Sequence, residues 1–328
     1  MPNPNRTAAK DSIFGTIAGH AIGDALGLGT EFLTRKQVSE YYPSRLIKYD
    51  QIIQDAHRRR WTPGDWTDDT DQMLCIMDSL IEKQQVDCLD IAKRLYQWAA
   101  NGGMGIGRST LSVLSSRSFL SDPHLAAKSY WESTGKQVAA NGGVMRTSVL
   151  GLWNHEGDTL LKNVEDVCKI THYDPRCVGS CVAVCLTIKG LTQGEKDLKS
   201  LLTWAGEVAV RYDGRMMKFI DLALNGSLED LELDGGKTPG DGIGYTLKAM
   251  AAGLWSVRNA KTFQDGLLQI IHEGGDSDTN GAVAGALLGA RFGQSGIPGD
   301  WFAGLARVDE LLHRWPRFEA CLNALSHH

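Results

Sequence analysis

Two short clusters of acidic and hydroxyl side chains are the parts of this sequence best suited to chemistry. The first, at residues 66–71, reads WTDDTD, and the second, at residues 274–280, reads GGDSDTN. Carboxylates packed this closely repel one another unless a cation lies between them. Oxygen ligands alone favour a hard cation such as Mg²⁺, Mn²⁺ or Ca²⁺ over zinc. We therefore interpret the two clusters as halves of one metal site, with enough acids for two ions.

Each cluster lies directly before a predicted helix. Apolar residues recur at helical spacing from Met73 to about Lys83, and residues 281–290 are almost all Gly, Ala, Val and Leu. The second helix is therefore expected to be buried. A helix N-terminus tolerates acids because its free N–H groups carry partial positive charge, and Thr67 is a suitable N-cap. Spacing alone leaves open the alternative that these are two capped, solvated helix starts.

Another helix is predicted at residues 12–28, where apolar residues recur at helical spacing among many small ones. Gly15, Gly19 and Gly23 are four residues apart and form a flat groove along it, so we expect a second helix to pack very close. Asp24 interrupts the apolar pattern. It is either a buried carboxylate with all its hydrogen-bond partners or a residue that supports the metal site.

The remaining pattern is also helical, and no run alternates as a strand of convincing length would. Residues 33–65 are interpreted as an irregular connection that covers the site, and the tail from Trp301 as one helix. Further helices are predicted at 88–100, in the more polar segment 193–227, and at 245–257. We therefore predict an all-α domain over residues 11–328, preceded by a flexible arm at residues 1–10.

Two glycine-rich turns could bind an anion through consecutive N–H groups at the start of a helix. Residues 101–110 read NGGMGIGRST, and residues 141–146 read NGGVMR, whose arginine suits a phosphate or ribose. A flexible link between helices is the alternative for the first turn. His172, just before another predicted helix, is expected to be neutral, because a helix start disfavours a cation; a simple capping role is the alternative.

Composition excludes several classes of function. The chain has 328 residues, 42% of them hydrophobic, and a formal net charge of −5, which argues against nucleic acid as the main ligand. The basic run at residues 57–60 is interpreted as a solvated loop. No apolar run approaches the ~20 residues of a membrane span, and the polar N-terminus does not read as a secretory signal.

The seven cysteines are scattered and mostly lie in apolar runs, which fits a reducing compartment, the cytoplasm or alternatively the nucleus. Cys177, Cys181 and Cys185 align on one helix face and are interpreted as small core residues. A thiolate metal site is the alternative, although no paired CxxC motif supports it.

Five motifs occur in the order found in the ADP-ribosylglycohydrolase family. They are GDALG at residues 23–27 followed by Glu31, TDDT at 67–70, NGGVMR at 141–146, TH at 171–172 and GGDSDT at 274–279. The sequence therefore resembles that family, which includes dinitrogenase-reductase-activating glycohydrolase and the ADP-ribosyl-acceptor hydrolases. The resemblance extends over about residues 12–310, and TDDT together with GGDxDT is its most specific part.

The resemblance implies a compact orthogonal helical domain with a central binuclear cleft, holding two Mg²⁺ or Mn²⁺ ions for which Ca²⁺ could substitute in a crystal. By match, the metal ligands are Glu31, Thr67, Asp68, Asp69, Asp276, Asp278 and Thr279, of which Glu31, Asp68 and Asp278 are the catalytic candidates. The loop similar to the one that holds the diphosphate and distal ribose comprises Gly103, Met104, Gly105, Ile106, Gly107, Arg108 and Ser109. The positions that match the lining of the ADP-ribose cleft are Asn141, Gly142, Gly143, Arg146 and His172.

The function that the resemblance implies is metal-dependent hydrolysis at C1″ of ADP-ribose in a modified protein or a small conjugate, by a monomer with no membrane partner. The arginine-directed bacterial members carry an aspartate in the glycine loop, whereas residues 104–107 here contain no acid. That departure favours other linkages, such as serine, O-acetyl or 1″-phosphate. A non-catalytic ADP-ribose-binding module and a nucleotide phosphohydrolase are the alternative functions.

Overall fold

A computed structural model describes residues 4–153, 156–235 and 242–325 of the chain. Over these residues it contains sixteen α-helices, four short 3₁₀ helices and one isolated β-bridge, between Ala140 and Tyr245. The all-α prediction is therefore confirmed. Buried apolar side chains from the first helix to the last form one connected core. No helix in the described ranges is long and apolar enough to span a membrane.

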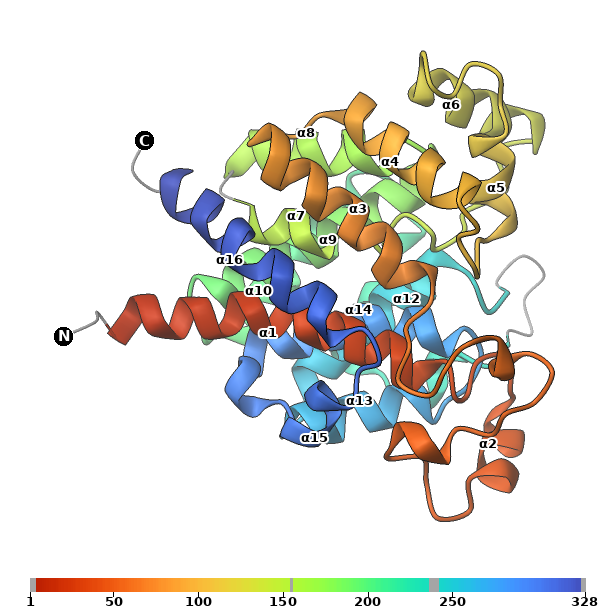
Figure 1. Cartoon of the computed structure of the whole chain (residues 1–328), viewed down its shortest axis with the longest axis vertical. Helices are drawn as coiled ribbons and strands as arrows, with labels where there is room; N and C mark the ends of the chain where they lie inside the picture. The colour runs from red at the N-terminus through yellow and green to blue at the C-terminus, as the bar shows by residue number, and fades with distance from the viewer. Residues whose placement is uncertain (1–3, 154–155, 236–241, 326–328) are drawn as a thin grey trace.

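The α-helices are α1 (Pro4–Gly27), α2 (Arg35–Tyr41), α3 (Asp68–Lys83), α4 (Cys88–Ala100), α5 (Arg108–Leu114), α6 (Pro123–Ser133), α7 (Ser148–Leu152), α8 (Gly157–Cys168), α9 (Pro175–Thr192), α10 (Leu198–Val210), α11 (Met216–Asn225), α12 (Thr246–Asn259), α13 (Phe263–Ile271), α14 (Ser277–Phe292), α15 (Gly299–Ala303) and α16 (Val308–Leu325). The 3₁₀ helices are η1 (Tyr49–Gln51), η2 (Arg58–Arg60), η3 (Glu229–Leu231) and η4 (Gln294–Gly296). In the view of Figure 1, α1 crosses the molecule, with α3, α7 and α9 on one side and α13 and α15 on the other.

Helices α1 and α14 form the most extensive helix pair of the fold, and glycines line both sides of their contact. Gly15, Gly19 and Gly23 of α1 lie opposite three glycines of α14, and their order along the two helices is antiparallel. A Cβ on Gly23 would stand only 1.9 Å from the carbonyl oxygen of Gly281. The close helix partner predicted from the α1 groove is therefore present, and the residues in contact allow no side chain.

The antiparallel pairing places the end of α1 beside the start of α14. Gly27, the last residue of α1, lies against Ser277, the first residue of α14. Consequently Glu31, four residues beyond α1, and the second acidic cluster, which opens α14, meet at the same end of the pair.

Asp24 joins the start of α3 to this pair. Its two carboxylate oxygens accept four hydrogen bonds, from the backbone N–H and the hydroxyl of Thr67 and of Thr70, at 2.6–3.0 Å. Thr67 is the N-cap residue of α3, as predicted, but its hydroxyl makes no capping bond of its own, and the carboxylate of Asp24 satisfies the free N–H groups instead. Burial raises the pKa of Asp24 to about 7, while these four hydrogen bonds oppose the rise.

The structure differs from the predicted elements in three places. The segment expected as a loose arm is helical from Pro4, since proline is well tolerated in the first turn of a helix. The connection at residues 33–65 contains α2 and two 3₁₀ helices, of which α2 is capped by Thr34. The tail from Trp301 forms two helices, α15 and α16, rather than one. In contrast, α3 and α4 end at the predicted residues, Lys83 and Ala100.

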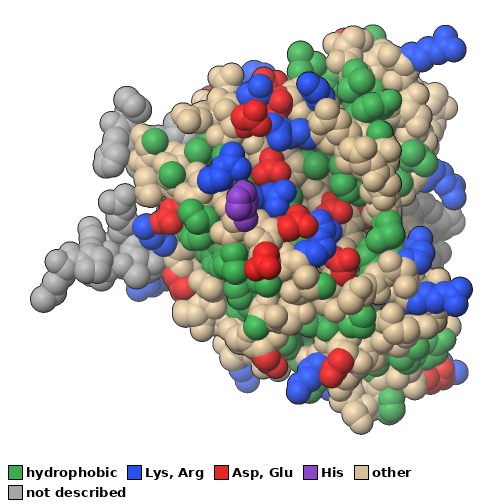
Figure 2. Space-filling view, viewed as in Figure 1, with side chains coloured by type: hydrophobic (Ala, Val, Ile, Leu, Met, Phe, Trp, Pro, Cys, Tyr) green, Lys and Arg blue, Asp and Glu red, His purple; other side chains and the backbone are tan. Residues whose placement is uncertain are grey.

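Cys177, Cys181 and Cys185 are free and buried in the core along α9, as predicted for small core residues. On the face drawn in Figure 2, Lys and Arg side chains are interspersed with Asp and Glu and form no broad basic surface.

Candidate functional site

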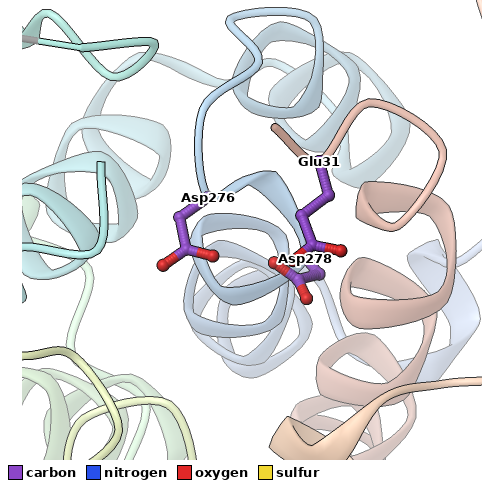
Figure 3. Close-up of side chains that lie close together, drawn as sticks. All are labelled: Glu31, Asp276 and Asp278. Atoms are coloured by element: carbon purple, nitrogen blue, oxygen red, sulfur yellow. The ribbon is translucent and has the colours of Figure 1, made fainter. Parts of the chain in front are cut away.

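The acidic groups converge from three elements that are far apart in the sequence. Carboxylate oxygens of Glu31, after α1, and of Asp276 and Asp278, at the start of α14, all lie within 4.8 Å of one another (Figure 3). The start of α3 reaches the same place, because the Thr67 hydroxyl oxygen lies 3.4 Å from Asp69 Oδ2 and 3.5 Å from Asp278 Oδ2. The two clusters identified in the sequence therefore form one site.

Four of the five acids of this site are buried almost completely, and Asp276 is partly exposed. Exposed fractions are 6% for Glu31, 6% for Asp68, 1% for Asp69 and 5% for Asp278. Burial raises the pKa of the Asp68, Asp69 and Asp278 carboxyls well above the usual range, and repulsion from neighbouring carboxylates adds to the rise. The pKa values of the Glu31 and Asp276 carboxyls are also raised, in both cases first by burial. A divalent cation would remove the cause of this repulsion.

The residues present fit such a cation. One buried oxygen, Asp69 Oδ1, has no hydrogen-bond partner in the described part of the chain, although a carboxylate oxygen without a partner is costly to bury. The remaining donor atoms are carboxylate and threonine oxygens, which hard divalent ions prefer. Thr279 supplies its backbone N–H to Asp278 Oδ1 at 2.8 Å, and a side-chain hydrogen bond between Thr279 and Asp69 opposes the rise in the pKa of that acid.

A cavity of about 440 Å³ opens beside the acids. Its lining consists of Glu31, Phe32, His57, Arg60, Trp61, Thr67, Asp68, Gly103, Met104, Gly105, Ile106 and Asp278. The first part of the predicted glycine loop thus faces the same cavity as the acids. Gly105 has φ +89° and lies so close that a Cβ would meet Asp68 Oδ1 at 2.6 Å, so both its conformation and its surroundings require glycine.

The end of the glycine loop lies outside the cavity lining. Gly107 is the N-cap residue of α5 and Arg108 is its first residue. The Ser109 hydroxyl oxygen accepts a 3.4 Å hydrogen bond from Tyr130. Beneath the start of the loop, the ring of Trp98 fills the space where Gly103 would carry a side chain.

The second glycine turn, at residues 141–146, contacts an acid of the site without lining the cavity. Asn141 donates from Nδ2 to Asp276 Oδ2 at 2.8 Å and so orients one acid directly. Gly142 packs on the ring of His172, and Gly143 packs on the sulfur of Cys168. None of these residues is among those that line the cavity.

Arg146 lies inside the protein, fully buried, and does not reach the cavity. Its guanidinium donates to Gln72 Oε1 at 2.7 Å and to Thr171 Oγ1 at 2.5 Å. Gln72 in turn donates to Asp68 Oδ2 at 2.8 Å. Arg146 therefore orients an acid of the site through Gln72, a part that the residue type alone did not indicate.

His172 completes the same network as a neutral imidazole. Because Thr171 Oγ1 accepts from Arg146, its own hydrogen is available to donate to His172 Nδ1, 2.8 Å away. Burial and the charge of Arg146 lower the pKa of His172 to about 3. The predicted neutral state of His172 is therefore supported by both its hydrogen bonds and its surroundings.

The interpretation of residues 57–60 as a solvated loop was wrong for Arg58, whereas Arg59 and Arg60 are exposed as predicted. Arg58 is 2% exposed, and its guanidinium donates to the backbone oxygens of Leu28, Gly29 and Glu31. It therefore fixes the turn that carries Glu31. The guanidinium also pairs with the carboxylate of Asp55, but no local pattern indicated its contacts with the three backbone oxygens, which lie about 30 residues away.

His57, also missed in the sequence, contacts Glu31 directly. His57 Nε2 lies 2.5 Å from Glu31 Oε2, and Arg60 Nη2 lies 2.8 Å from His57 Nδ1. An arginine can only donate, so His57 Nδ1 must accept, and the imidazole proton is on Nε2, from which it is donated to Glu31. The ring of His57 also contacts Phe32 and Trp61, with centroids 4.9 and 5.5 Å away.

Fold and site together define an all-α protein whose central cleft is lined by buried carboxylates suited to divalent cations. The family model described as ADP-ribosylglycohydrolase matches residues 5–325, and the chain belongs to this family. A solved structure described as an ADP-ribosylglycohydrolase-related protein complex is similar to this one, with a TM-score of 0.75 and 26% identity, over 96% of this chain and 99% of that chain.

Curated relatives include proteins with different named activities. The chain is 27% identical to the ADP-ribosyl-[dinitrogen reductase] glycohydrolase of Rhodospirillum rubrum, over 94% of this chain and 93% of that protein. It is 25% identical to ADP-ribosylarginine hydrolase Tri1 of Serratia proteamaculans, over 92% and 77%, respectively. It is also 25% identical to ADP-ribosylhydrolase ARH3 of Gallus gallus, over 88% and 87%.

Proposed function

We propose that this protein is a divalent-metal-dependent hydrolase that cleaves the bond at C1″ of ADP-ribose in an ADP-ribosylated protein or a small conjugate. The observation that carries the proposal is the convergence of Glu31, Asp68 and Asp278 on one cavity that the glycine loop also lines. Family membership and the named activities of the relatives support ADP-ribose as the substrate.

Glu31 is the residue that we propose to orient the attacking water and accept its proton. The His57 N–H is directed at Oε2, which leaves the other carboxylate oxygen of Glu31 without a hydrogen bond in the described residues. A fixed donor on one oxygen holds the carboxylate in one orientation and favours its ionised form. The transition state would have oxocarbenium character, as in other glycoside cleavages.

The metal ions are proposed to be two Mg²⁺ or Mn²⁺, held by Glu31, Thr67, Asp68, Asp69, Asp276, Asp278 and Thr279. Five carboxylates carry more negative charge than one divalent ion balances, which supports two ions. When bound, such ions would hold ribose hydroxyls and lower the pKa of a coordinated water. Backbone N–H groups of residues 103–106 are proposed to bind the diphosphate.

The acids in the cavity lining support a proposal about the substrate linkage. Its described lining contains no acid other than Glu31, Asp68 and Asp278, all of which belong to the proposed metal site. A cationic arginine acceptor would therefore find no free carboxylate, and we propose an oxygen-linked acceptor instead. We further propose that the protein acts as a cytoplasmic monomer.

The test is hydrolysis of arginine-linked, serine-linked, O-acetyl and 1″-phosphate conjugates in Mg²⁺, Mn²⁺ and EDTA. We expect release of free ADP-ribose from at least one conjugate with metal, no turnover in EDTA, and no turnover by Asp278→Asn. Asp50→Asn, which changes an exposed acid on η1, is the matched control and should retain activity. Full activity of Asp278→Asn in EDTA would refute the proposal.

Two other outcomes identify the alternatives. Tight binding of ADP-ribose without turnover of any conjugate would indicate a non-catalytic binding module. Release of phosphate from nucleotides, with no cleavage at C1″, would indicate a nucleotide phosphohydrolase.

A further inference from the structure

Arg60 is the one Lys or Arg among the described residues that line the cavity. The acids around it belong to the proposed metal site, so Arg60 presents a positive charge to any ligand that enters. Arg60 lies on η2, in the segment that the sequence indicated as a solvated loop. The proposed function above assigns it no part.

The Arg60 side chain is held in one orientation although it is exposed. Its Nε donates to the His57 backbone oxygen at 3.1 Å and Nη2 to His57 Nδ1 at 2.8 Å. The guanidinium also stacks over the buried ring of Trp61, with 4.5 Å between its carbon and the ring centroid. Nη1 has no hydrogen-bond partner among the described residues, so its two N–H groups are available to a ligand.

Arg60 lies at the end of the cavity that contains Glu31. His57 alone separates it from Glu31, through contacts of 2.8 and 2.5 Å at the two ring nitrogens. Because Glu31 is the proposed water-orienting residue, Arg60 lies at the end of the cavity where C1″ would react, within reach of the groups bonded to that carbon. Residues 103–106, which we assign to the diphosphate, belong to a different segment of the lining.

We propose that Arg60 forms an anion subsite for the leaving group and that the preferred substrates are phosphate esters at C1″ of ADP-ribose. This inference rests on the proposed function. A phosphate accepts charge-assisted hydrogen bonds from the free N–H groups of Arg60, whereas a guanidinium acceptor is repelled by the same side chain.

The reaction balances without any additional reactant. Water forms the new C1″–O bond, and the bond between C1″ and the phosphate oxygen breaks with its electron pair on that oxygen. The proton that Glu31 accepts from water passes to the departing phosphate. The products are ADP-ribose and hydrogen phosphate, with all four original oxygens of the phosphate retained.

The test compares kcat/KM for the 1″-phosphate and a serine-linked conjugate, whose leaving group is uncharged, in the wild type, Arg60→Gln and Arg60→Glu. Loss of one charge-assisted hydrogen bond should lower kcat/KM for the phosphate about 10- to 100-fold. The ratio of the two substrates is decisive, because any disturbance of His57 affects both equally. Arg60→Lys should recover part of the preference, and Arg60→Glu, which repels a phosphate, should shift it toward the serine conjugate.

Two controls separate the subsite from other effects. Arg59→Gln changes an adjacent exposed arginine that does not line the cavity and should leave both activities unchanged. Hydrolysis in ¹⁸O-water should leave the released phosphate unlabelled, because the bond that breaks is at carbon. Affinity for free ADP-ribose should be the same in Arg60→Gln as in the wild type.

Three results would overturn the inference while leaving the proposed function intact. The first is an equal loss of kcat/KM on both substrates together with weaker binding of free ADP-ribose, which would assign Arg60 to the diphosphate. The second is an unchanged kcat/KM for the phosphate in Arg60→Gln. The third is incorporation of ¹⁸O into the released phosphate. If the wild type hydrolyses no conjugate at all, the proposed function itself fails, and the inference fails with it.

Discussion

The glycine contact between α1 and α14 allows a sharp test of how the fold builds the site. In Gly23→Ala, the new Cβ would stand 1.9 Å from the Gly281 carbonyl oxygen. Restoring an ordinary contact of about 3.4 Å requires the two helices to separate by about 1.5 Å, since 3.4 minus 1.9 is 1.5. The obstacle is backbone, which cannot turn aside as a flexible side chain can.

We expect two effects of this separation. Overpacking typically costs about 1–3 kcal/mol, and a rigid carbonyl puts Gly23→Ala near the upper end, about 3 kcal/mol. The same movement displaces Glu31 from Asp276 and Asp278, whose oxygens now lie within 4.8 Å. Because a misplacement of about 1 Å can lower the rate about 100-fold, kcat/KM should fall by at least that factor.

The assays are thermal unfolding, Mn²⁺ affinity, and kcat/KM on the best conjugate. Gly214→Ala is the matched control, because a Cβ there would have no neighbour within 4 Å. Gly281→Ala should reproduce the defect from the other helix, and the double variant should lose less than the sum, since the helices are already apart. If Gly23→Ala matches Gly214→Ala in stability and activity, the reasoning is refuted.

Three further predictions concern the acids and their supports. Asp24→Asn replaces one acceptor oxygen with a donor amide and loses two of the four hydrogen bonds at the start of α3. The free energy of unfolding should therefore fall by about 2–4 kcal/mol. An unchanged midpoint in denaturant titrations would contradict this expectation. The raised carboxyl pKa values at the site mean that the folded state binds protons more tightly than the unfolded state. In EDTA, the free energy of unfolding should therefore decrease as pH rises from about 4 toward neutrality. Mn²⁺ should reverse this loss, and its affinity should increase with pH. His57→Gln should lower kcat about 10- to 100-fold with little change in KM, because Glu31 loses the donor that orients it. If KM rises by that factor instead and kcat is unchanged, His57 belongs to substrate binding.

The acidic site illustrates why much could be predicted from the sequence. Local spacing placed both acid-threonine clusters at helix starts, because apolar periodicity follows each of them directly. Mutual repulsion of carboxylates then required a shared cation, so the two clusters were expected to converge. The glycine groove of α1 likewise predicted a close helix, since glycines four residues apart lie on one face.

Supporting residues were harder to identify. The type of Arg146 suggested a ligand contact, yet the fold buries it against Gln72 and Thr171. His57 and Arg58 looked like part of a solvated basic run, yet they hold Glu31 and its turn. In each case the partner lies 25 or more residues away, so no periodic pattern connects the pair.

The sequence by itself determined the helices that carry the site, the acids and the glycine face of α1, because each depends on spacing within one segment. It did not determine which helix fills the groove of α1 or in which direction it runs. Only the tertiary structure decided that α14 packs there antiparallel, and this pairing brings Glu31 to Asp276 and Asp278. The physical reason is that two backbones can approach this closely only where the glycines of both helices coincide, a condition that neither segment specifies alone.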